Sequence, residues 1–181
     1  MPPRTPHRPD PHQAGGRSDN DARLSAQLAA VISGARRRAT RDADRQVDTA
    51  HLLHSLLEHD PEVRDVFEGE PRTARLLGYL VQRSIGYGLR WQNSVEDSGA
   101  VPVVTEADGL SPLASGALEH ACERAARRGE EAARGVDLLA AIVVDGQARA
   151  VEVLARAGID AGEVYARIDS RPGSRVGESG C

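Results

Sequence analysis

The chain has 181 residues, of which 40% are hydrophobic, 28% are charged and only 3% are aromatic. This composition is typical of one globular domain with a core of aliphatic side chains. The formal net charge is −4, and every one of the 23 basic residues is arginine. A chain without lysine has neither the lysine of a phosphate-binding loop nor a Schiff-base nucleophile, which excludes lysine-based catalysis and argues against ATP hydrolysis.

No apolar stretch approaches the roughly 18 residues that a membrane-spanning helix needs. Met1–Asn20 is rich in proline, arginine and aspartate, and it lacks the apolar core of a signal peptide. The cysteines are few, Cys122 and Cys181, and this usage fits a reducing compartment. We therefore expect a cytoplasmic protein without a membrane contact.

Residues 1–21 combine proline, glycine and charged residues, so we predict a disordered N-terminal tail. Ser25 is a candidate N-cap, and an aliphatic stripe at helical spacing follows it. The stripe consists of Leu28, Val31, Ile32, Ala35 and Ala39. A shorter, strongly apolar helix is predicted to begin with Thr49 as its cap and to end at Asp60-Pro61. Two further helices are predicted over Glu62–Glu68 and Arg72–Ser84.

Residues 85–109 are predicted to form a linker, because glycine, asparagine, serine and aspartate are frequent there. The linker also holds Val101–Val104, an apolar run for which strand pairing remains open. Ser111-Pro112 then combines a capping hydroxyl with proline at the first helical position. Later helices are predicted over Gln147–Ala157 and Ala161–Ile168, before a disordered tail over residues 170–181.

An internal repeat relates the two parts of this pattern. Residues 24–53 align with residues 110–139 at a constant offset of 86 without a gap. The identical pairs are Leu24/Leu110, Ser25/Ser111, Ala35/Ala121, Arg38/Arg124, Ala39/Ala125, Arg41/Arg127, Leu52/Leu138 and Leu53/Leu139. The repeat predicts two copies of one helical unit, residues 22–84 and residues 110–169, on either side of the linker.

Motifs in both copies resemble the repeat unit of a known family. The first copy contains Ala35–Ala39 and Val47–Leu53, and the second contains Ala125–Gly129, Gly135–Leu139 and Gly146–Ile159. Their order and spacing resemble the N-terminal double-repeat domain of Clp-type AAA+ unfoldases over about residues 22–169. The last of these segments is the most specific.

The resemblance implies an all-α fold with two tandem four-helix repeats related by a pseudo-twofold axis. It also implies a non-enzymatic module that binds adaptors, unfolded substrates or components of a Clp chaperone–protease system. The ATPase modules that follow this domain in full-length relatives are absent from the sequence. A free-standing copy would act as an adaptor, a competitor or a sequestering protein, and the residues do not rank these roles.

Two departures limit what the resemblance implies. In some relatives the glutamate of a Thr-Glu-His motif helps to recognise phosphorylated arginine, and this chain has Ala50 and Val136 at the two matching positions. Phosphoarginine binding is therefore in doubt. The histidine of the motif is kept as His51 in the first copy and replaced by Asp137 in the second.

No catalytic, cofactor-binding or metal-binding residues are predicted. His51 and His54 lie on one predicted helix with His59, but no third ligand shares their face, and a metal needs three or four ligands. We expect His51 to be buried and hydrogen-bonded. Cys122 is expected to be a small core thiol, because His120, two residues earlier, points to nearly the opposite side of the helix.

Arginines cluster in both copies, around Arg36–Arg38 and around Arg124. Because acidic residues lie nearby and the chain is acidic overall, we expect solvated helix faces or a dock for an acidic protein. A helical regulatory or nucleic-acid-associated protein that uses these faces is the alternative. Three of the five aromatic residues lie in or beside the linker. The candidate partner-binding residues are Tyr79, Tyr87, Trp91, Thr49, His51, Arg38 and Arg124.

Overall fold

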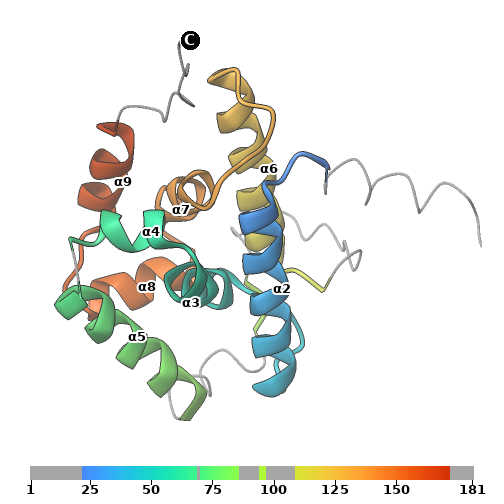
Figure 1. Cartoon of the computed structure of the whole chain (residues 1–181). Helices are drawn as coiled ribbons and strands as arrows, with labels where there is room; N and C mark the ends of the chain where they lie inside the picture. Colours follow the sequence, from blue (N-terminus) through green and yellow to red (C-terminus); the bar gives the residue numbers. More distant parts are fainter. Residues whose placement is uncertain (1–21, 69, 86–93, 97–108, 172–181) are drawn as a thin grey trace, which may run out of the picture.

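The computed structural model describes residues 22–68, 70–85, 94–96 and 109–171 (Figure 1). We call residues 22–85 the first half and residues 109–171 the second half. The helices are α2 (Ala26–Arg41), α3 (Thr49–His59), α4 (Pro61–Val66), α5 (Glu70–Ile85), α6 (Pro112–Arg127), α7 (Gly135–Val143), α8 (Arg149–Arg156) and α9 (Ala161–Asp169). Within these residues the only β pairing is two isolated bridges, so the predicted all-α class is confirmed.

Two predicted caps, Ser25 and Ser111, begin their helices as expected, and an aspartate caps the last helix in the same way. The hydroxyl of Ser25 accepts a hydrogen bond from the Leu28 N–H at 3.1 Å, and Ser111 accepts one from the Ala114 N–H at 3.1 Å. The side chain of Asp160 likewise accepts from the third residue of α9. These bonds satisfy backbone donors that a helix leaves unpaired in its first turn.

The predicted cap of α3 was wrong by one residue. Asp48, not Thr49, has the extended backbone of an N-cap, and its carboxylate accepts from the His51 N–H at 2.9 Å. In return, the Asp48 N–H donates to Nδ1 of His51 at 3.1 Å, which completes a capping box. The Thr49 hydroxyl is engaged elsewhere, in the candidate site described below.

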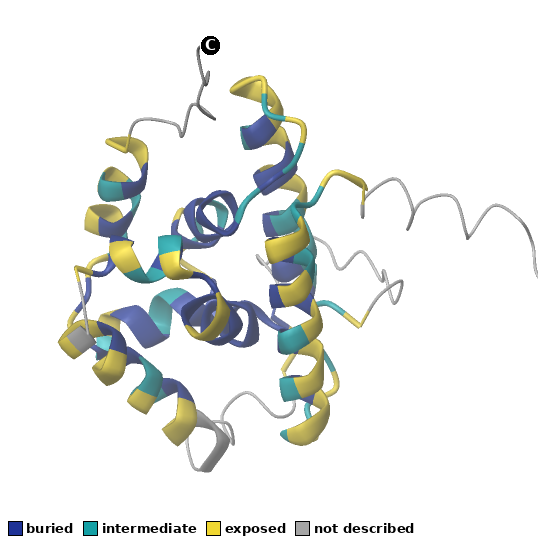
Figure 2. Ribbon diagram, in the orientation of Figure 1, coloured by how far each residue is buried: buried dark blue, intermediate teal, exposed yellow. Residues whose placement is uncertain are grey.

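Helices α3 and α7 form the centre of the molecule. Nine of the eleven residues of α3 and eight of the nine residues of α7 are buried (Figure 2). Leu52 and Leu53 of α3 occupy the same places as Leu138 and Leu139 of α7, and all four have no exposed surface. Each such side chain contributes roughly 1.5–3 kcal/mol relative to an exposed one. The duplicated leucines therefore make the core.

Backbone contacts between the halves come in matched pairs. Leu24 bridges to Ala133, and Val47 bridges to Leu110. Adding 86 to Leu24 and Val47 gives Leu110 and Ala133, so each bridge maps onto the other when the halves are exchanged. The chain that enters the first helix of each half thus pairs with the loop before the second helix of the other half.

Helix packing shows the same correspondence. Helix α2 packs on α3 as α6 packs on α7, and α8 contacts α3 as α4 contacts α7. Helix α5 also contacts α8, as α9 contacts α4, so elements of the two halves alternate around one shared core (Figure 1). These matched contacts support the predicted pseudo-twofold relation between two tandem repeats. The exact limits of the repeats, the linker and the tails stay predictions.

Several expectations fall on other parts of the chain. Tyr87, Trp91 and Val101–Val104 lie outside the described residues, as do the N-terminal tail and most of the predicted C-terminal tail. Among the helices that the structure describes, none combines the length and hydrophobicity required to cross a membrane.

Candidate functional site

A carboxylate is buried where the two halves meet. Glu96, which is 4% exposed, belongs to the predicted linker and points between the starts of α3, α6 and α8. Its Oε2 accepts from the Thr49 N–H at 2.9 Å and from the Ser111 hydroxyl at 2.6 Å. Its Oε1 accepts from the Arg149 N–H at 2.7 Å and from the hydroxyl of Thr49. We call the donors on Thr49, Ser111 and Arg149 the Glu96 pocket.

A buried ion pair lies beside this pocket. The guanidinium of Arg149 is 2.8 Å from the carboxylate of Asp48, which has no exposed surface. The same guanidinium donates to the carbonyl of Ser94 at 2.7 Å and to its hydroxyl at 3.0 Å. Burial raises the pKa of the Glu96 carboxyl, and the nearby Asp48 carboxylate raises it further, while the hydrogen bonds oppose that change.

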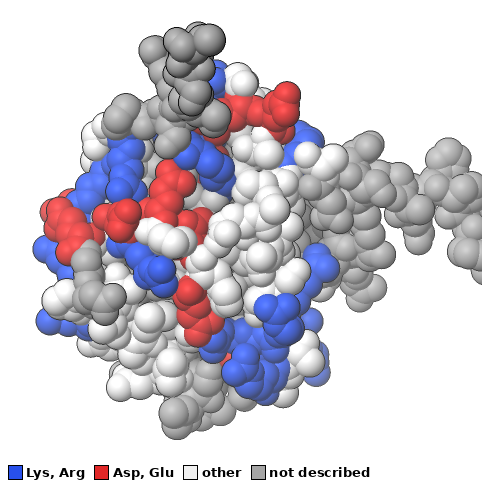
Figure 3. Space-filling view, viewed as in Figure 1, with Lys and Arg blue, Asp and Glu red and all other residues white. Residues whose placement is uncertain are grey.

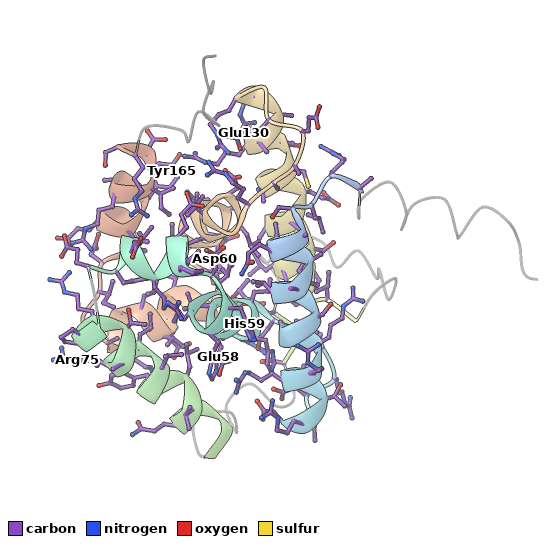
Figure 4. All side chains as sticks on the ribbon, viewed as in Figure 1. Glu58, His59, Asp60, Arg75, Glu130 and Tyr165 are labelled. Carbon is purple, nitrogen blue, oxygen red and sulfur yellow. The ribbon has the colours of Figure 1, made fainter. Side chains whose placement is uncertain are left out.

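The Glu96 pocket has a differently built counterpart at the start of α4, which is found by exchanging the two halves. Subtracting 86 from Arg149 gives Val63, whose N–H donates to Asp60 at 3.3 Å. Asp60 lies at the start of the same helix (Figure 4). At the matching position before α8 stands Gly146, and the N-cap residue of α8 makes no side-chain hydrogen bond. Helix α8 therefore lacks a local cap, and Glu96 supplies the carboxylate from a distant segment.

This counterpart, which also lies between the halves, is tightly closed. Gly135 matches Thr49 at the offset of 86, and a Cβ at Gly135 would lie 2.0 Å from Oδ2 of Asp60. Asp60 is itself only 4% exposed. The short side chain of Asp60 thus fills the counterpart site, whereas the longer side chain of Glu96, from the predicted linker, fills the Glu96 pocket.

A surface hollow of about 370 Å³ opens beside the Glu96 pocket, between α6 and α7. Thr49 lines both sites, because its backbone N–H and hydroxyl face Glu96 while the residue also borders the hollow. The apolar part of the lining includes Leu113, Ala117 and Ile142, and Gly146 lies at its border. The Glu96 pocket and the hollow therefore share Thr49 as a common border.

His51, the family histidine, is fully buried. Its Nε2 lies 3.0 Å from the carboxylate of Asp44, while its Nδ1 completes the capping box with Asp48. Potential ligand atoms of Asp42, Asp44 and His51 lie within 4.8 Å of one another. The carboxylates come from the loop after α2, whereas the sequence prediction considered only ligands on the same helix face as His51 and His54. The three groups lie close enough together to hold a metal ion.

The second half contains a matching cluster in which acid and base are exchanged at two of the three positions, while Asp44 corresponds to another acid, Glu130. Asp42 corresponds to Arg128, and His51 corresponds to Asp137, at the offset of 86. Arg128 lies 2.6 Å from the buried Asp137 and 2.9 Å from Glu130 (Figure 4), and it lowers the pKa of the Glu130 carboxyl. Because one ion cluster replaces the other, we interpret the carboxylates around His51 as its charge partners rather than as metal ligands.

The remaining predicted contacts are spread over the surface. Arg38 pairs with Glu58 at 2.7 Å, and Arg124 pairs with Asp169 at 3.0 Å. Figure 3 shows basic side chains gathered toward the C-terminal end of α2 and mixed charges over the opposite side. Tyr79 is half-buried and packs against the core from α5. Of the described candidates, only Thr49 belongs to the Glu96 pocket.

The predicted absence of a reactive thiol agrees with the surroundings of Cys122. The side chain is buried, and burial raises the pKa of its thiol, which disfavours the nucleophilic thiolate. Glu96, Ser111 and Arg149 are the site residues that sequence reasoning missed. A signal existed in the repeat alignment, because Gly146 stands where the first copy has the capping Asp60.

A pH prediction follows from His54, which is 3% exposed and lies 3.4 Å from the Glu58 carboxylate. Burial and then the charge of Arg38 lower its pKa to about 4, while Glu58, Asp42 and His51 also act on the same imidazole. Below about pH 6.5 the histidine is protonated in the unfolded chain, whereas in the folded protein it stays neutral until the pH approaches 4. The stability that the fold has above pH 6.5 is therefore lost progressively as the pH falls toward 4.

We therefore expect the His54→Gln variant to lose less free energy of unfolding than the wild type between about pH 7 and pH 4.5. Urea unfolding at both pH values measures the difference. Parallel losses in the two proteins would contradict the prediction.

Several solved structures share this helical fold. The N-terminal domain of the chaperone ClpD from Arabidopsis thaliana has a TM-score of 0.60 at 19% identity, covering 82% of this chain and 94% of that one. The Hsp104 N-terminal domain from Candida albicans has a TM-score of 0.59 at 12% identity, covering 81% and 89%. The N-terminal domain of the ClpV1 ATPase from E. coli has a TM-score of 0.56 at 19% identity, covering 84% and 90%.

No protein-family model matches the chain, and no curated protein sequence matches it. The likeness at these low identities concerns the fold, and it extends over most of each compared domain. The predicted resemblance is confirmed at that level. The chain has the fold of the N-terminal domains of Clp and Hsp104 ATPases.

Proposed function

We propose that this chain is a non-enzymatic protein-interaction module of a cytoplasmic Clp chaperone–protease system. The observation that carries the proposal is the extent of the fold, because the chain covers 94% of the ClpD N-terminal domain. That domain belongs to a protein described as a chaperone associated with a caseinolytic protease. The partners would be adaptors, unfolded substrates or Clp components, which the chain would deliver, compete for or sequester.

The buried site supports binding rather than catalysis. Its carboxylate is held by hydrogen-bond donors, and its guanidinium is paired with Asp48. Neither Ala50 nor Val136 supplies the carboxylate that relatives use for phosphorylated arginine, so the proposed partner is recognised through other groups. Tyr79, Tyr87 and Trp91 remain the proposed aromatic contacts.

Affinity capture from a native lysate tests the proposal. The tagged chain is expected to recover a Clp unfoldase, protease or adaptor, identified by mass spectrometry. The double variant Tyr87→Ala, Trp91→Ala is expected to recover at least fivefold less, since aromatic anchors dominate many interfaces. Val81→Ala removes an apolar side chain of α5 that is 48% exposed, and it serves as the matched control.

The opposing results are equally specific. Recovery of no Clp component with the unaltered chain would contradict the proposal. Salt-sensitive retention on DNA, lost when Arg38 and Arg124 are both replaced by alanine, would favour the nucleic-acid alternative. The existing ion pairs of these arginines do not favour that alternative.

A further inference from the structure

We propose that the Glu96 pocket is a docking site for an acidic side chain of a protein partner, occupied in the isolated chain by its own Glu96. This inference rests on the proposed function and deepens it, because it names the chemical group that the module would recognise. The partner group replaces the Glu96 carboxylate on the same donors.

The chemistry of the pocket defines its ligand. Two backbone N–H groups, on Thr49 and Arg149, and two hydroxyl groups, on Thr49 and Ser111, converge on the two carboxylate oxygens. The N–H donors belong to the first residues of α3 and α8, where the helix dipoles add positive potential. The pocket therefore selects a group with two anionic oxygens.

The pocket is built from both halves, but its occupant belongs to neither. Thr49 lies in the first half, Ser111 and Arg149 lie in the second, and Glu96 comes from the predicted linker. In the counterpart site the carboxylate of Asp60 sits three residues before the N–H that it caps. Such a cap belongs to the helix that it caps, whereas Glu96 reaches the start of α8 from 53 residues away in the sequence.

The adjoining hollow provides space for the chain that carries the acid. It borders Thr49 and is lined mostly by apolar residues of α6 and α7, including Leu113 and Ile142, with His120 and Asp145 as its charged or titratable lining residues. At the other side of the pocket, the guanidinium of Arg149 binds the carbonyl of Ser94. A backbone carbonyl, a carboxylate and an apolar side chain are what a peptide offers together, and a free inorganic anion offers only one of them.

The test uses the tripeptide acetyl-Ser-Val-Glu-amide, which repeats the sequence Ser94–Glu96 and its contacts. Binding to the full chain is followed through the NMR amide shifts of Thr49 and Arg149. The internal carboxylate competes at an effective concentration on the order of millimolar, so the wild type should bind the peptide weakly. The Glu96→Ala variant should bind it at least tenfold more tightly.

Two controls isolate the carboxylate. The peptide acetyl-Ser-Val-Gln-amide should bind Glu96→Ala at least tenfold more weakly, because an amide N–H₂ would face the Thr49 N–H donor. Glu119→Ala, which removes an exposed carboxylate from α6, should leave the wild-type affinity unchanged. If Glu96→Ala does not fold, Glu96→Gln keeps the pocket filled by a weaker competitor and should bind the glutamate peptide more tightly than the wild type does.

Several results would overturn the proposal. Equal affinity of the wild type and the folded Glu96 variants for the glutamate peptide would show that Glu96 does not compete for its site. Tighter binding of inorganic phosphate than of the peptide to Glu96→Ala would identify a site for a free oxyanion instead. The capture experiment is independent, since peptide binding without recovery of a Clp component would contradict the proposed function alone.

Discussion

Replacing His51 by aspartate is expected to destabilise the fold by about 3–5 kcal/mol, the range for an uncompensated buried charge. An aspartate could still accept the Asp48 N–H bond, as Asp137 accepts the Arg134 N–H at 2.9 Å in the second half. The local cap would therefore survive. The loss arises because the new carboxylate would face Asp42, Asp44 and Asp48 without exposure to water.

Urea unfolding of His51→Asp and of the wild type measures this loss. The control is His120→Asp, the same substitution at an exposed position of α6, where a change within about 0.5 kcal/mol is expected. The like charges should raise the pKa of the new carboxyl, so the variant should recover stability relative to the wild type as pH falls below about 6. A loss below about 1 kcal/mol would show that the cluster around His51 is not electrostatically organised.

Local signals in the sequence predicted the helical framework. Serine before a helical stripe located the starts of α2 and α6, because capping depends on residues within one turn. The paired leucines of the repeat located the buried centre for a similar reason, since Leu52 and Leu138 each lie on a short, strongly apolar segment. Helix class and core position follow from spacing along the chain.

The candidate site could not be obtained in the same way. Glu96 and Ser111 are 15 residues apart, and Glu96 and Arg149 are 53 apart, so their contacts exist only after the halves have packed. Glu96 also lies in a polar linker, where an acidic residue is ordinarily solvated. Only its burial and its four hydrogen bonds distinguish it from a surface carboxylate.

The repeat itself carried information that comparison of identical residues overlooks. Asp42 and Arg128, and likewise His51 and Asp137, differ in the sign of the charge that each can carry. Each difference between the halves, taken alone, looks like the loss of one residue of the repeated motif. Considered together, they place an acid beside a base at the same two positions in each half, with the acid and the base exchanged.

The charge-inverted relation makes its strongest prediction at Asp137, which is 1% exposed. Asp137→Leu should cost about 1–3 kcal/mol, because it removes one acceptor of Arg128, which keeps Glu130, together with the acceptor of the Arg134 N–H. Asp137→Asn retains that acceptor, so its loss should be smaller. Urea unfolding of both variants separates the capping bond from the charge.

A double substitution then tests whether the clusters are interchangeable. Asp137→His combined with Arg128→Asp transfers the aspartate–histidine pair of the first half to the second half. The two residues are in direct contact, so their effects should not add, and the double variant should be at least about 1 kcal/mol more stable than the sum of the single losses predicts. Strict additivity would mean that the opposite charges at these matched positions arose independently. Coupling would mean that in each half the charge that is tolerated at position 42 or 128 depends on the residue at position 51 or 137.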